Sequence, residues 1–274
     1  MKYRLIAMDM DGTLLNSAHA LTPRTADALR AASRAGAHVV LASGRMPCAL
    51  RPFVRALDIT SPLICYNGAV IAQSPTEEVL HQFAIGRDLA REAAALCEGM
   101  GLHVQAYRDD AFYCAADNAF SRDYQAFLNA PVRRVVTGER LSGWLTFDTP
   151  KLLAIDAPER IAEYLPRLRE ALLGRLKVAT SQPRFIEFVS PEAGKAAALE
   201  RLCAITGVAR GEVAAFGDGL NDLDMIGWAG LGCAVENAVP EVRDSADEII
   251  PSNDEDGVAR TVERLLKEGM LGGD

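Results

Sequence analysis

The sequence predicts an α/β fold with a doubly wound, mostly parallel sheet as its core and an inserted α+β domain. First, an apolar run at residues 5–8 is followed by a helix pattern and a second apolar run, as in a parallel strand, helix, strand unit. Second, this alternation returns after Gly194. Third, the segment between these two parts, residues 84–190, shows helix patterns mixed with hairpin patterns. We therefore predict a core of residues 1–83 and 191–274 and an inserted domain of residues 84–190.

The first apolar run leads into Asp9 and Asp11, and a turn with Gly12 follows. In open α/β sheets, ligands bind beyond the carboxyl ends of the strands, where both side chains would emerge on the same side. A carboxylate is a poor nucleophile unless a nearby charge compensates it, so the pair predicts a divalent cation and an anionic substrate, which points to phosphate chemistry. The alternative is a capped, solvated turn without chemistry.

The next helix begins at Thr22-Pro23, a capping residue and a proline suited to the first turn, and ends at Gly36. The second strand, residues 39–42, leads into Ser43-Gly44-Arg45. Ser43 is therefore expected beside Asp9, where its hydroxyl and the free amides of the following helix would bind a phosphate oxygen. An ordinary helix N-cap is the alternative for Ser43.

Asn67-Gly68 lies between two apolar runs and supplies the positive φ angles of a tight hairpin turn, so we assign Asn67 a structural role. In the inserted domain, Arg108-Asp109-Asp110 is expected to form an antiparallel turn. The expected helices of this domain lie near residues 88–98, 118–129 and 158–172, and its expected strands near 102–107, 111–115, 151–156, 175–180 and 184–189.

A helix from Lys195 to about Thr206, closed by Gly207, resumes the core pattern. A cation at a helix N-terminus opposes the helix dipole by about 0.3–1 kcal/mol, so Lys195 is better explained if an anion lies near it. A solvated surface lysine is the alternative.

The run from Val213 to Gly217 repeats the pattern of the first strand, because Asp218, Asn221 and Asp222 follow it closely. Oxygen ligands of this kind suit Mg²⁺ and disfavour zinc. The alternating acidic ligands and terminal glutamate of a calcium loop are missing. We assign no role to the four histidines. The remaining expected elements are strands at residues 231–235 and 248–250 and a last helix that opens at Asp256-Gly257-Val258.

The net charge of −8 argues against nucleic acid and anionic membranes as partners, since both need a basic surface. An anionic substrate must then be bound by local cations. The six cysteines include no Cys-x-x-Cys pair and suit a reducing compartment as buried free thiols. The apolar run before Asp9 is too short for a signal peptide, and no run of roughly 18 apolar residues occurs. We therefore expect a cytoplasmic protein.

Four motifs, taken together and in order, resemble those of the haloacid dehalogenase-like hydrolases. Any one of them is weak, but all four stand at strand or helix ends, and the resemblance covers essentially the whole chain. It implies a Rossmann-like core with the inserted domain as a cap. The motifs are Asp9-Met10-Asp11-Gly12-Thr13, Ser43-Gly44-Arg45, Lys195 and Gly217-Asp218-Gly219-Leu220-Asn221-Asp222.

Three further features resemble the Cof-type branch of this family: the large insertion, Tyr66-Asn67-Gly68-Ala69, and the segment from Ser252 to Val258. The chain departs from the family pattern at two positions. Ser43 stands where many relatives carry threonine, which keeps the hydroxyl, and Ala196 follows Lys195 where glycine is common. Neither departure changes the expected chemistry.

The resemblance implies roles for the matched residues. Asp9 would attack the phosphoryl group and form an aspartyl phosphate, while Asp11 would protonate the leaving oxygen and later deprotonate a water molecule. Mg²⁺ would be held by the carboxylates of Asp9 and Asp218, the main-chain carbonyl of Asp11, and Asp222 through water. The cap would close over the site and select the substrate. The phosphate-binding groups would be the Met10 amide, Ser43, the Gly44 amide, Lys195 and Asn221.

We therefore expect a Mg²⁺-dependent phosphatase of small phosphorylated metabolites, with sugar phosphates as the expected class. A sugar phosphomutase or phosphotransferase is the close alternative, because related enzymes return the phosphoryl group to a second hydroxyl. A non-catalytic phosphometabolite sensor would have lost Asp9 or Asp11, and both are present. The expected partner is a small phosphorylated molecule, with no nucleic acid and no membrane, and the protein is expected to be a monomer or homodimer.

Overall fold

The computed structural model describes residues 2–128, 132–180 and 182–273. Within these residues the chain divides into two compact units. The second unit comprises Arg45–Ala49 and Gln82–Ala193, and the first comprises the rest of the described chain. The predicted domain boundaries, residues 1–83 and 191–274 for the core and residues 84–190 for the inserted domain, stay a prediction.

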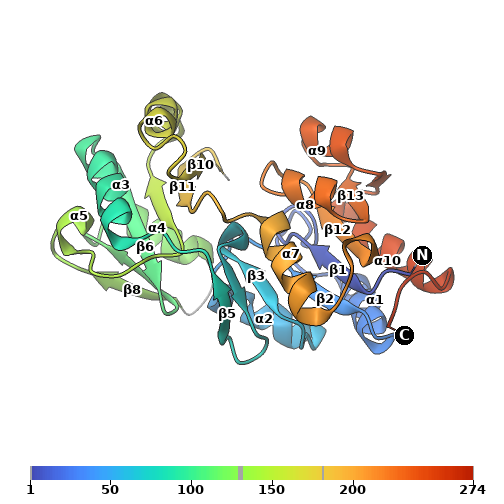
Figure 1. Ribbon diagram of the computed structural model, residues 1–274. Helices are drawn as coiled ribbons and strands as arrows, with labels where there is room; N and C mark the ends of the chain where they lie inside the picture. The colour runs from blue at the N-terminus through green and yellow to red at the C-terminus, as the bar shows by residue number, and fades with distance from the viewer. Residues whose placement is uncertain (1, 129–131, 181, 274) are drawn as a thin grey trace. The chain divides into compact units, whose positions relative to one another are not determined.

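The core strands of the first unit are β1 (Leu5–Met8), β2 (His38–Leu41), β12 (Val213–Gly217), β13 (Leu231–Val235) and β14 (Glu248–Ile250). They form a parallel sheet in the order β14-β13-β12-β1-β2 (Figure 1). Leu5 aligns with Val213 on one side and His38 on the other. Every residue of β1 is buried, which explains its continuous apolar run. Residues that follow β1, β2 and β12 therefore emerge at one edge of the sheet.

The helices of the first unit are α1 (Pro23–Arg34), α7 (Lys195–Thr206), α8 (Leu223–Trp228), α9 (Pro240–Ser245) and α10 (Gly257–Lys267). A further helix, α2 (Pro47–Leu57), has its first three residues in the second unit and the rest in the first. Thr22 caps α1, since its hydroxyl accepts a hydrogen bond from the Thr25 amide at 3.1 Å. α1 packs against α10, and the two ends of the described chain meet nearby (Figure 1). There the Tyr3 amide donates to the Met270 carbonyl at 2.7 Å.

A smaller sheet contains β3 (Leu63–Cys65), β4 (Val70–Ala72) and β5 (Val79–Gln82) in that order. β3 and β4 are antiparallel, so the predicted hairpin is confirmed. Its turn contains Tyr66, Asn67 and Gly68 with φ angles of 52°, 56° and 92°. Asn and Gly are the residues that tolerate such angles best, so the Asn-Gly pair in the sequence predicted this turn.

The second unit is a six-stranded sheet, in the order β10-β11-β9-β6-β7-β8, with helices packed against it. All strand pairs are antiparallel except β7 with β8. Asp109 and Asp110, with φ angles of 49° and 55°, form the predicted turn between β6 and β7. Its elements are α3 (Arg87–Gly99), β6 (His103–Arg108), β7 (Ala111–Cys114), α4 (Ala119–Leu128), β8 (Arg133–Val136), α5 (Leu141–Trp144), β9 (Leu152–Ile155), α6 (Pro158–Ala171), β10 (Lys177–Ala179) and β11 (Phe185–Val189).

The two faces of this second sheet differ. Val104 and Ala106 of β6 belong to an apolar core that also takes side chains from α3 and α6. The intervening Gln105 is buried as well, and its amide lies 3.0 Å from the Nε2 atom of His103. Lys151 and Glu187 form a buried ion pair at 2.9 Å. The strand period of two therefore separates an apolar face from a buried polar one.

Some local predictions were wrong. α2 begins at Pro47, so Ser43 is not its N-cap. β5, β8, α5, α8 and α9 were not predicted. α4 corresponds to the helix expected near residues 118–129, of which residue 129 lies outside the described residues. The six cysteines are free and buried, as predicted.

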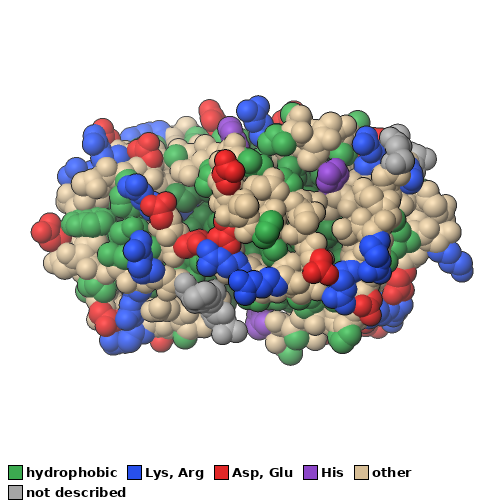
Figure 2. All heavy atoms as spheres, turned by 90° about the horizontal axis from the view of Figure 1, so that it is seen from below, with side chains coloured by type: hydrophobic (Ala, Val, Ile, Leu, Met, Phe, Trp, Pro, Cys, Tyr) green, Lys and Arg blue, Asp and Glu red, His purple; other side chains and the backbone are tan. Residues whose placement is uncertain are grey.

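None of the helices in the described part of the chain has the length and apolar character needed to cross a membrane. On the face shown in Figure 2, Lys and Arg side chains are interspersed with Asp and Glu side chains. Such a mixed surface does not favour nucleic acid, and the expectation of no nucleic-acid partner stays a prediction.

Candidate active site

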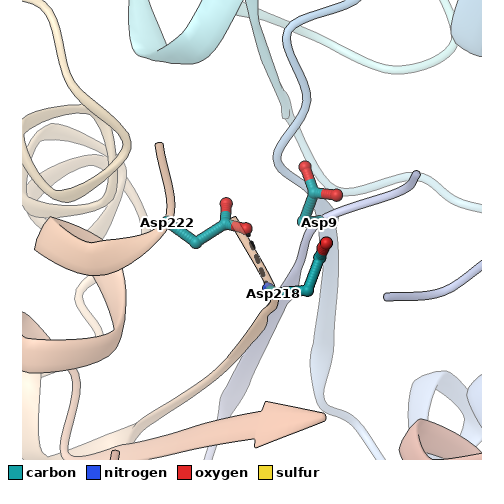
Figure 3. A group of neighbouring side chains, drawn as sticks. All are labelled: Asp9, Asp218 and Asp222. Carbon is teal, nitrogen blue, oxygen red and sulfur yellow. Dashed lines mark hydrogen bonds between the residues drawn. The ribbon is translucent and has the colours of Figure 1, made fainter. Parts of the chain in front are cut away.

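Three carboxylates meet where the central strands of the first unit end. Asp9 directly follows β1 and Asp218 directly follows β12, and the Asp9 amide donates to the Phe216 carbonyl at 3.0 Å. Asp222 precedes α8. Each residue offers a carboxylate oxygen within 4.8 Å of the other two, and all three point toward a shared space (Figure 3). We call Asp9, Asp218 and Asp222 the acidic trio.

Asp222 is fixed by the loop between β12 and α8. Its Oδ2 atom accepts hydrogen bonds from the amides of Asp218 and Gly219, both at 3.0 Å. Its Oδ1 atom accepts from the Nζ atom of Lys195 at 2.5 Å. A Cβ atom at Gly217 would lie 2.5 Å from the Cβ atom of Asp222, so only glycine leaves room for this approach. Asp222 therefore holds the loop and Lys195 in place.

Lys195 is fully buried at the first position of α7 and bridges two members of the trio. Its Nζ atom lies 2.5 Å from Oδ1 of Asp9 as well as of Asp222. These carboxylates are the anions that the placement of a lysine at a helix N-terminus predicted. Burial by itself would lower the pKa of Lys195, but the attraction of the two carboxylates outweighs it and the pKa is raised.

The start of α7 is set by a close backbone contact. Gly68, in the hairpin turn, has a φ of +92°, and a Cβ atom there would lie 2.1 Å from the Gly194 carbonyl oxygen. It would also lie 2.9 Å from the Lys195 amide nitrogen. The absence of a side chain at Gly68 therefore allows the hairpin to pack directly against the residue that carries the buried ammonium.

Burial is the largest influence on the pKa values of Asp9 and Asp218. It raises the pKa of Asp9 well above the ordinary value, Lys195 partly counters this, and the charges of Asp222 and Asp218 raise it further. Burial also raises the pKa of Asp218 to about 6, although the Thr13 hydroxyl donates to its Oδ1 atom at 2.6 Å. Among the described residues, both ion pairs of the trio involve Lys195. With all three carboxylates ionised, the site therefore holds excess negative charge.

Asp11 lies near the trio in sequence, but its side chain is not part of it. The carboxylate is 38% exposed, and its Oδ1 atom lies 3.5 Å from the Nδ1 atom of His19. No pattern in the sequence indicated a role for His19. Its contact with Asp11 depends on the loop between them, in which His19 has a φ of 55°. No residue pattern in the sequence signals that contact.

The predicted phosphate-binding residues occupy neighbouring strand ends. Met10 and Ser43 are buried. Ser43 lies two residues after the end of β2, and the amide of the intervening Ala42 donates to the Met8 carbonyl at 2.8 Å. Asn221 is exposed.

Asn67 is a contact residue that sequence reasoning treated as a turn only. The Asn221 side chain donates to its Oδ1 atom at 3.2 Å. A Cβ atom on Gly44 would lie 3.0 Å from the same oxygen. The predicted turn geometry placed Asn67 correctly, but only the fold brings it to Gly44 and Asn221.

The donor set of the trio fits a hard divalent cation. All its atoms are carboxylate oxygens, and the excess negative charge is what a buried cation would neutralise. Asp9 and Asp218 are the members that would hold Mg²⁺ directly, because both oxygens of Asp222 already accept hydrogen bonds from protein donors. Thiolate and imidazole ligands, which zinc favours, are not part of this group of described residues.

A family model described as haloacid dehalogenase-like hydrolase matches residues 6–262. The chain belongs to this family. The Bacillus subtilis (strain 168) protein named "Putative phosphatase YxeH" is 32% identical over 271 residues, covering 96% of this chain and 98% of that protein. The 5-amino-6-(5-phospho-D-ribitylamino)uracil phosphatase YcsE of the same organism is 31% identical over 261 residues, covering 94% of each chain.

Solved structures agree with this assignment. A haloacid dehalogenase-like hydrolase from Bacteroides thetaiotaomicron has a TM-score of 0.86 and 31% identity, covering 96% of this chain and all of that chain. The predicted fold, an α/β sheet core of the haloacid dehalogenase type with an added α+β part, and the predicted Cof-type family are confirmed. The chain is a phosphoric monoester hydrolase, so its substrate is a small phosphorylated molecule.

Proposed function

We propose that this phosphatase uses Mg²⁺ and an aspartyl-phosphate intermediate on Asp9 to hydrolyse small phosphorylated metabolites. One observation carries the proposal: Asp9 is a buried carboxylate that is held by the Lys195 ammonium inside an acidic trio with excess negative charge. Such a site repels a phosphate group unless a cation is bound there. Once a cation is bound, the site holds a carboxylate in position to attack phosphorus.

The two oxygens of Asp9 have different surroundings. Oδ1 accepts the hydrogen bond from Lys195, and among the described residues no hydrogen bond involves Oδ2. Oδ2 is therefore the atom we assign to attack on phosphorus. Mg²⁺ bound by Asp9 and Asp218 supplies the positive charge that offsets the repulsion between carboxylate and phosphate. Lys195 fixes the Asp9 carboxylate throughout, because its own position is fixed by Asp222.

Asp11 is the proposed general acid and base. Its side chain lies outside the trio and is partly exposed, so it is accessible to a proton-exchanging substrate or water. It would give a proton to the leaving oxygen in the first half of the reaction and take one from the attacking water in the second. Its main-chain carbonyl is the further oxygen that we assign to the cation.

The phosphate oxygens would contact groups at the same edge of the sheet. Ser43 offers a hydroxyl and Asn221 an amide, and both belong to segments that also contact Asn67. The Asn67 amide donates to the Ser43 carbonyl at 3.0 Å, which supports this arrangement. The other assigned groups are the main-chain amides of Met10 and Gly44 and the ammonium of Lys195.

For the substrate, we propose a phosphate monoester on a polyhydroxylated carbon chain, with sugar phosphates first. The name of YcsE specifies a phosphoribitylamino compound, which shares a phosphorylated polyol chain with sugar phosphates. Selection among such substrates is assigned to the second unit, which acts as the cap. Exchange of the Gln82–Ala193 segment for that of YcsE should then transfer substrate preference, while an unchanged preference would contradict this assignment.

The test is phosphate release from a panel of sugar phosphates, phosphorylated polyols and nucleotides, with Mg²⁺ or with chelator. We expect release that depends on Mg²⁺ and is concentrated on one chemical class. Asp9→Asn should abolish release while the melting temperature stays high. Release that persists in chelator would contradict the cation, and isomerisation without release of phosphate would show a mutase.

We further propose a cytoplasmic location, which the buried free thiols support. Cell fractionation of an epitope-tagged chain tests it. We expect the protein in the cytoplasmic fraction, whereas recovery outside the cytoplasm would contradict the proposal.

A further inference from the structure

The loop that follows Asp11 is held from outside by side chains from the turn after β13 and from the segment before α10. Asn237 donates from Nδ2 to the Gly12 carbonyl at 2.8 Å. Asn253 donates from Nδ2 to the Leu15 carbonyl at 2.9 Å. Asp254 accepts from both the amide and the hydroxyl of Ser17, at 2.8 and 2.6 Å.

The two asparagines are also joined to each other. The Asn253 amide donates to Oδ1 of Asn237 at 3.0 Å, so Asn237 links Asn253 to the Gly12 carbonyl. Asn253 is buried, which makes its polar contacts costly to lose. The three residues therefore act as one connected support rather than as separate surface contacts.

The segment that carries Asn253 and Asp254 is a tightly closed turn. The amides of Glu255 and Gly257 both donate to the Ser252 carbonyl, at 3.0 and 3.1 Å, which closes a tight turn. A Cβ atom at Gly257 would lie 1.8 Å from the Pro251 carbonyl oxygen, so the turn has no room for another residue type. Such a turn fixes the direction in which Asn253 and Asp254 point.

The loop itself is confined on its other side. Gly12 has a φ of +92°, and a Cβ atom there would lie 2.4 Å from Oδ2 of Asp218. Gly12 is therefore confined between the acidic trio and Asn237. Asp11 directly precedes it, so a shift of the Gly12 carbonyl moves the main chain that carries the Asp11 carboxylate.

We propose that Asn237 and Asn253 are positioning residues that hold Asp11 where it can protonate the leaving oxygen. The inference rests on the proposed function, which makes Asp11 the general acid. In that step, the bond between Asp9 Oδ2 and phosphorus forms and the ester bond from phosphorus to the leaving oxygen breaks. The leaving oxygen keeps the electron pair of the broken bond and takes the proton from the Asp11 carboxyl.

The need for this proton depends on the leaving group, which separates positioning from a general loss of structure. The alkoxide of a sugar is a poor leaving group and needs the proton in the transition state. p-Nitrophenolate is a stable anion and leaves without it. The parameter kcat/KM reports the steps through formation of the aspartyl phosphate, so it does not include the later role of Asp11 as base.

The experiment compares kcat/KM for ribose 5-phosphate and p-nitrophenyl phosphate in wild type, Asn237→Ala, Asn253→Asp and Asp11→Asn. Asn237 is exposed, so its replacement leaves the core intact. The matched control is Gln73→Ala, because the Gln73 amide also donates to a main-chain carbonyl, that of Thr60 at 2.9 Å, elsewhere in the first unit. Melting temperatures show that each variant is folded.

We expect Asn237→Ala and Asn253→Asp to lower kcat/KM for ribose 5-phosphate about 10- to 100-fold, the size of a misplacement by about 1 Å. The kcat/KM for p-nitrophenyl phosphate should fall by less than about threefold, because p-nitrophenolate leaves without a proton from Asp11. Asp11→Asn should show the same contrast at about 10²- to 10⁴-fold, and Gln73→Ala should show none.

Two results would overturn the inference in different ways. In the first result, Asp11→Asn lowers kcat/KM much more for ribose 5-phosphate than for p-nitrophenyl phosphate, whereas the Asn237 and Asn253 variants either leave kcat/KM unchanged or lower it equally for both substrates. The positioning role then fails, and the proposed function stands. In the second result, Asp11→Asn itself lowers kcat/KM equally for both substrates. The role of Asp11 as general acid then fails, and the inference fails with it.

Discussion

Lys195→Met removes the ammonium on which the electrostatic account of the site depends. The lysine side chain is 0% exposed, and its partners Asp9 and Asp222 are 8% and 1% exposed. Methionine keeps an unbranched stem but leaves two buried carboxylates without their cation. Removing one partner of a buried ion pair costs about 3–5 kcal/mol. We therefore expect the free energy of unfolding to fall by that amount, a large part of the about 5–15 kcal/mol of a typical domain.

The assay is urea unfolding at pH 7 in chelator, followed by tryptophan fluorescence. A Trp144→Phe background leaves Trp228, at the end of α8 in the first unit, as the reporter. The matched control is Arg24→Met, which removes a cation from the exposed pair with Glu263, where the side chains are 45% and 43% exposed. That change should cost at most about 1 kcal/mol. A loss for Lys195→Met no larger than the control's would refute the reasoning.

Three further predictions concern His103, Gly68 and the ligands of Mg²⁺. Burial lowers the pKa of His103 from 6.5 to about 4, so the unfolded chain binds a proton in this range while the folded chain does not. Stability should therefore fall by about 3 kcal/mol as the pH drops from about 6.5 to 4, and His103→Gln, measured by urea unfolding, should lose this component. Gly68→Ala should lower kcat/KM at least about tenfold by displacing the start of α7, whereas Gly207→Ala, with nothing within 4 Å of the added Cβ, should only lower stability by about 1 kcal/mol. Mg²⁺ at about 100 times its Kd should stabilise the wild type by about 2.7 kcal/mol in thermal unfolding, and Asp218→Asn should remove most of this gain.

Each of these has an outcome that contradicts it. An identical pH dependence in wild type and His103→Gln would show that His103 is protonated in the fold. Equal effects of the two glycine replacements would mean that only their positive φ matters. An undiminished Mg²⁺ effect in Asp218→Asn would exclude Asp218 as a ligand.

Local signals in the sequence predicted the elements that carry the candidate site. β1 and β12 were recognisable because both are buried on two faces and therefore apolar at every position. α7 was recognisable from its closing Gly207, whose φ of 70° suits glycine. Since these strand and helix ends lie at one edge of the sheet, the position of the site followed from them.

The missed elements lack such local signals. β8 begins with Arg133 and Arg134 at the edge of its sheet, so its strand character comes from pairing with β7 rather than from apolar alternation. α5 and α8 have only four and six residues, too few for a helical period to show.

The missed site contacts depend on distant parts of the chain. Asn67 and Asn221 are 154 residues apart, and Asn237 and Gly12 are 225 residues apart. Their residue types are common in turns, so the sequence alone predicts a turn and not a partner. Only the assembled sheet determines which turns meet.

The central claim is that Asp9 carries the phosphoryl group, and trapping that group tests it most directly. In Asp11→Asn, p-nitrophenyl phosphate should still phosphorylate the enzyme, but hydrolysis of the intermediate should be slow because its base is missing. The reaction is quenched in acid, reduced with borohydride, digested and analysed by mass spectrometry. We predict homoserine, the reduction product of an aspartyl phosphate, at position 9 and dependence of this product on Mg²⁺. Unmodified Asp9 during continued release of p-nitrophenolate would contradict the account.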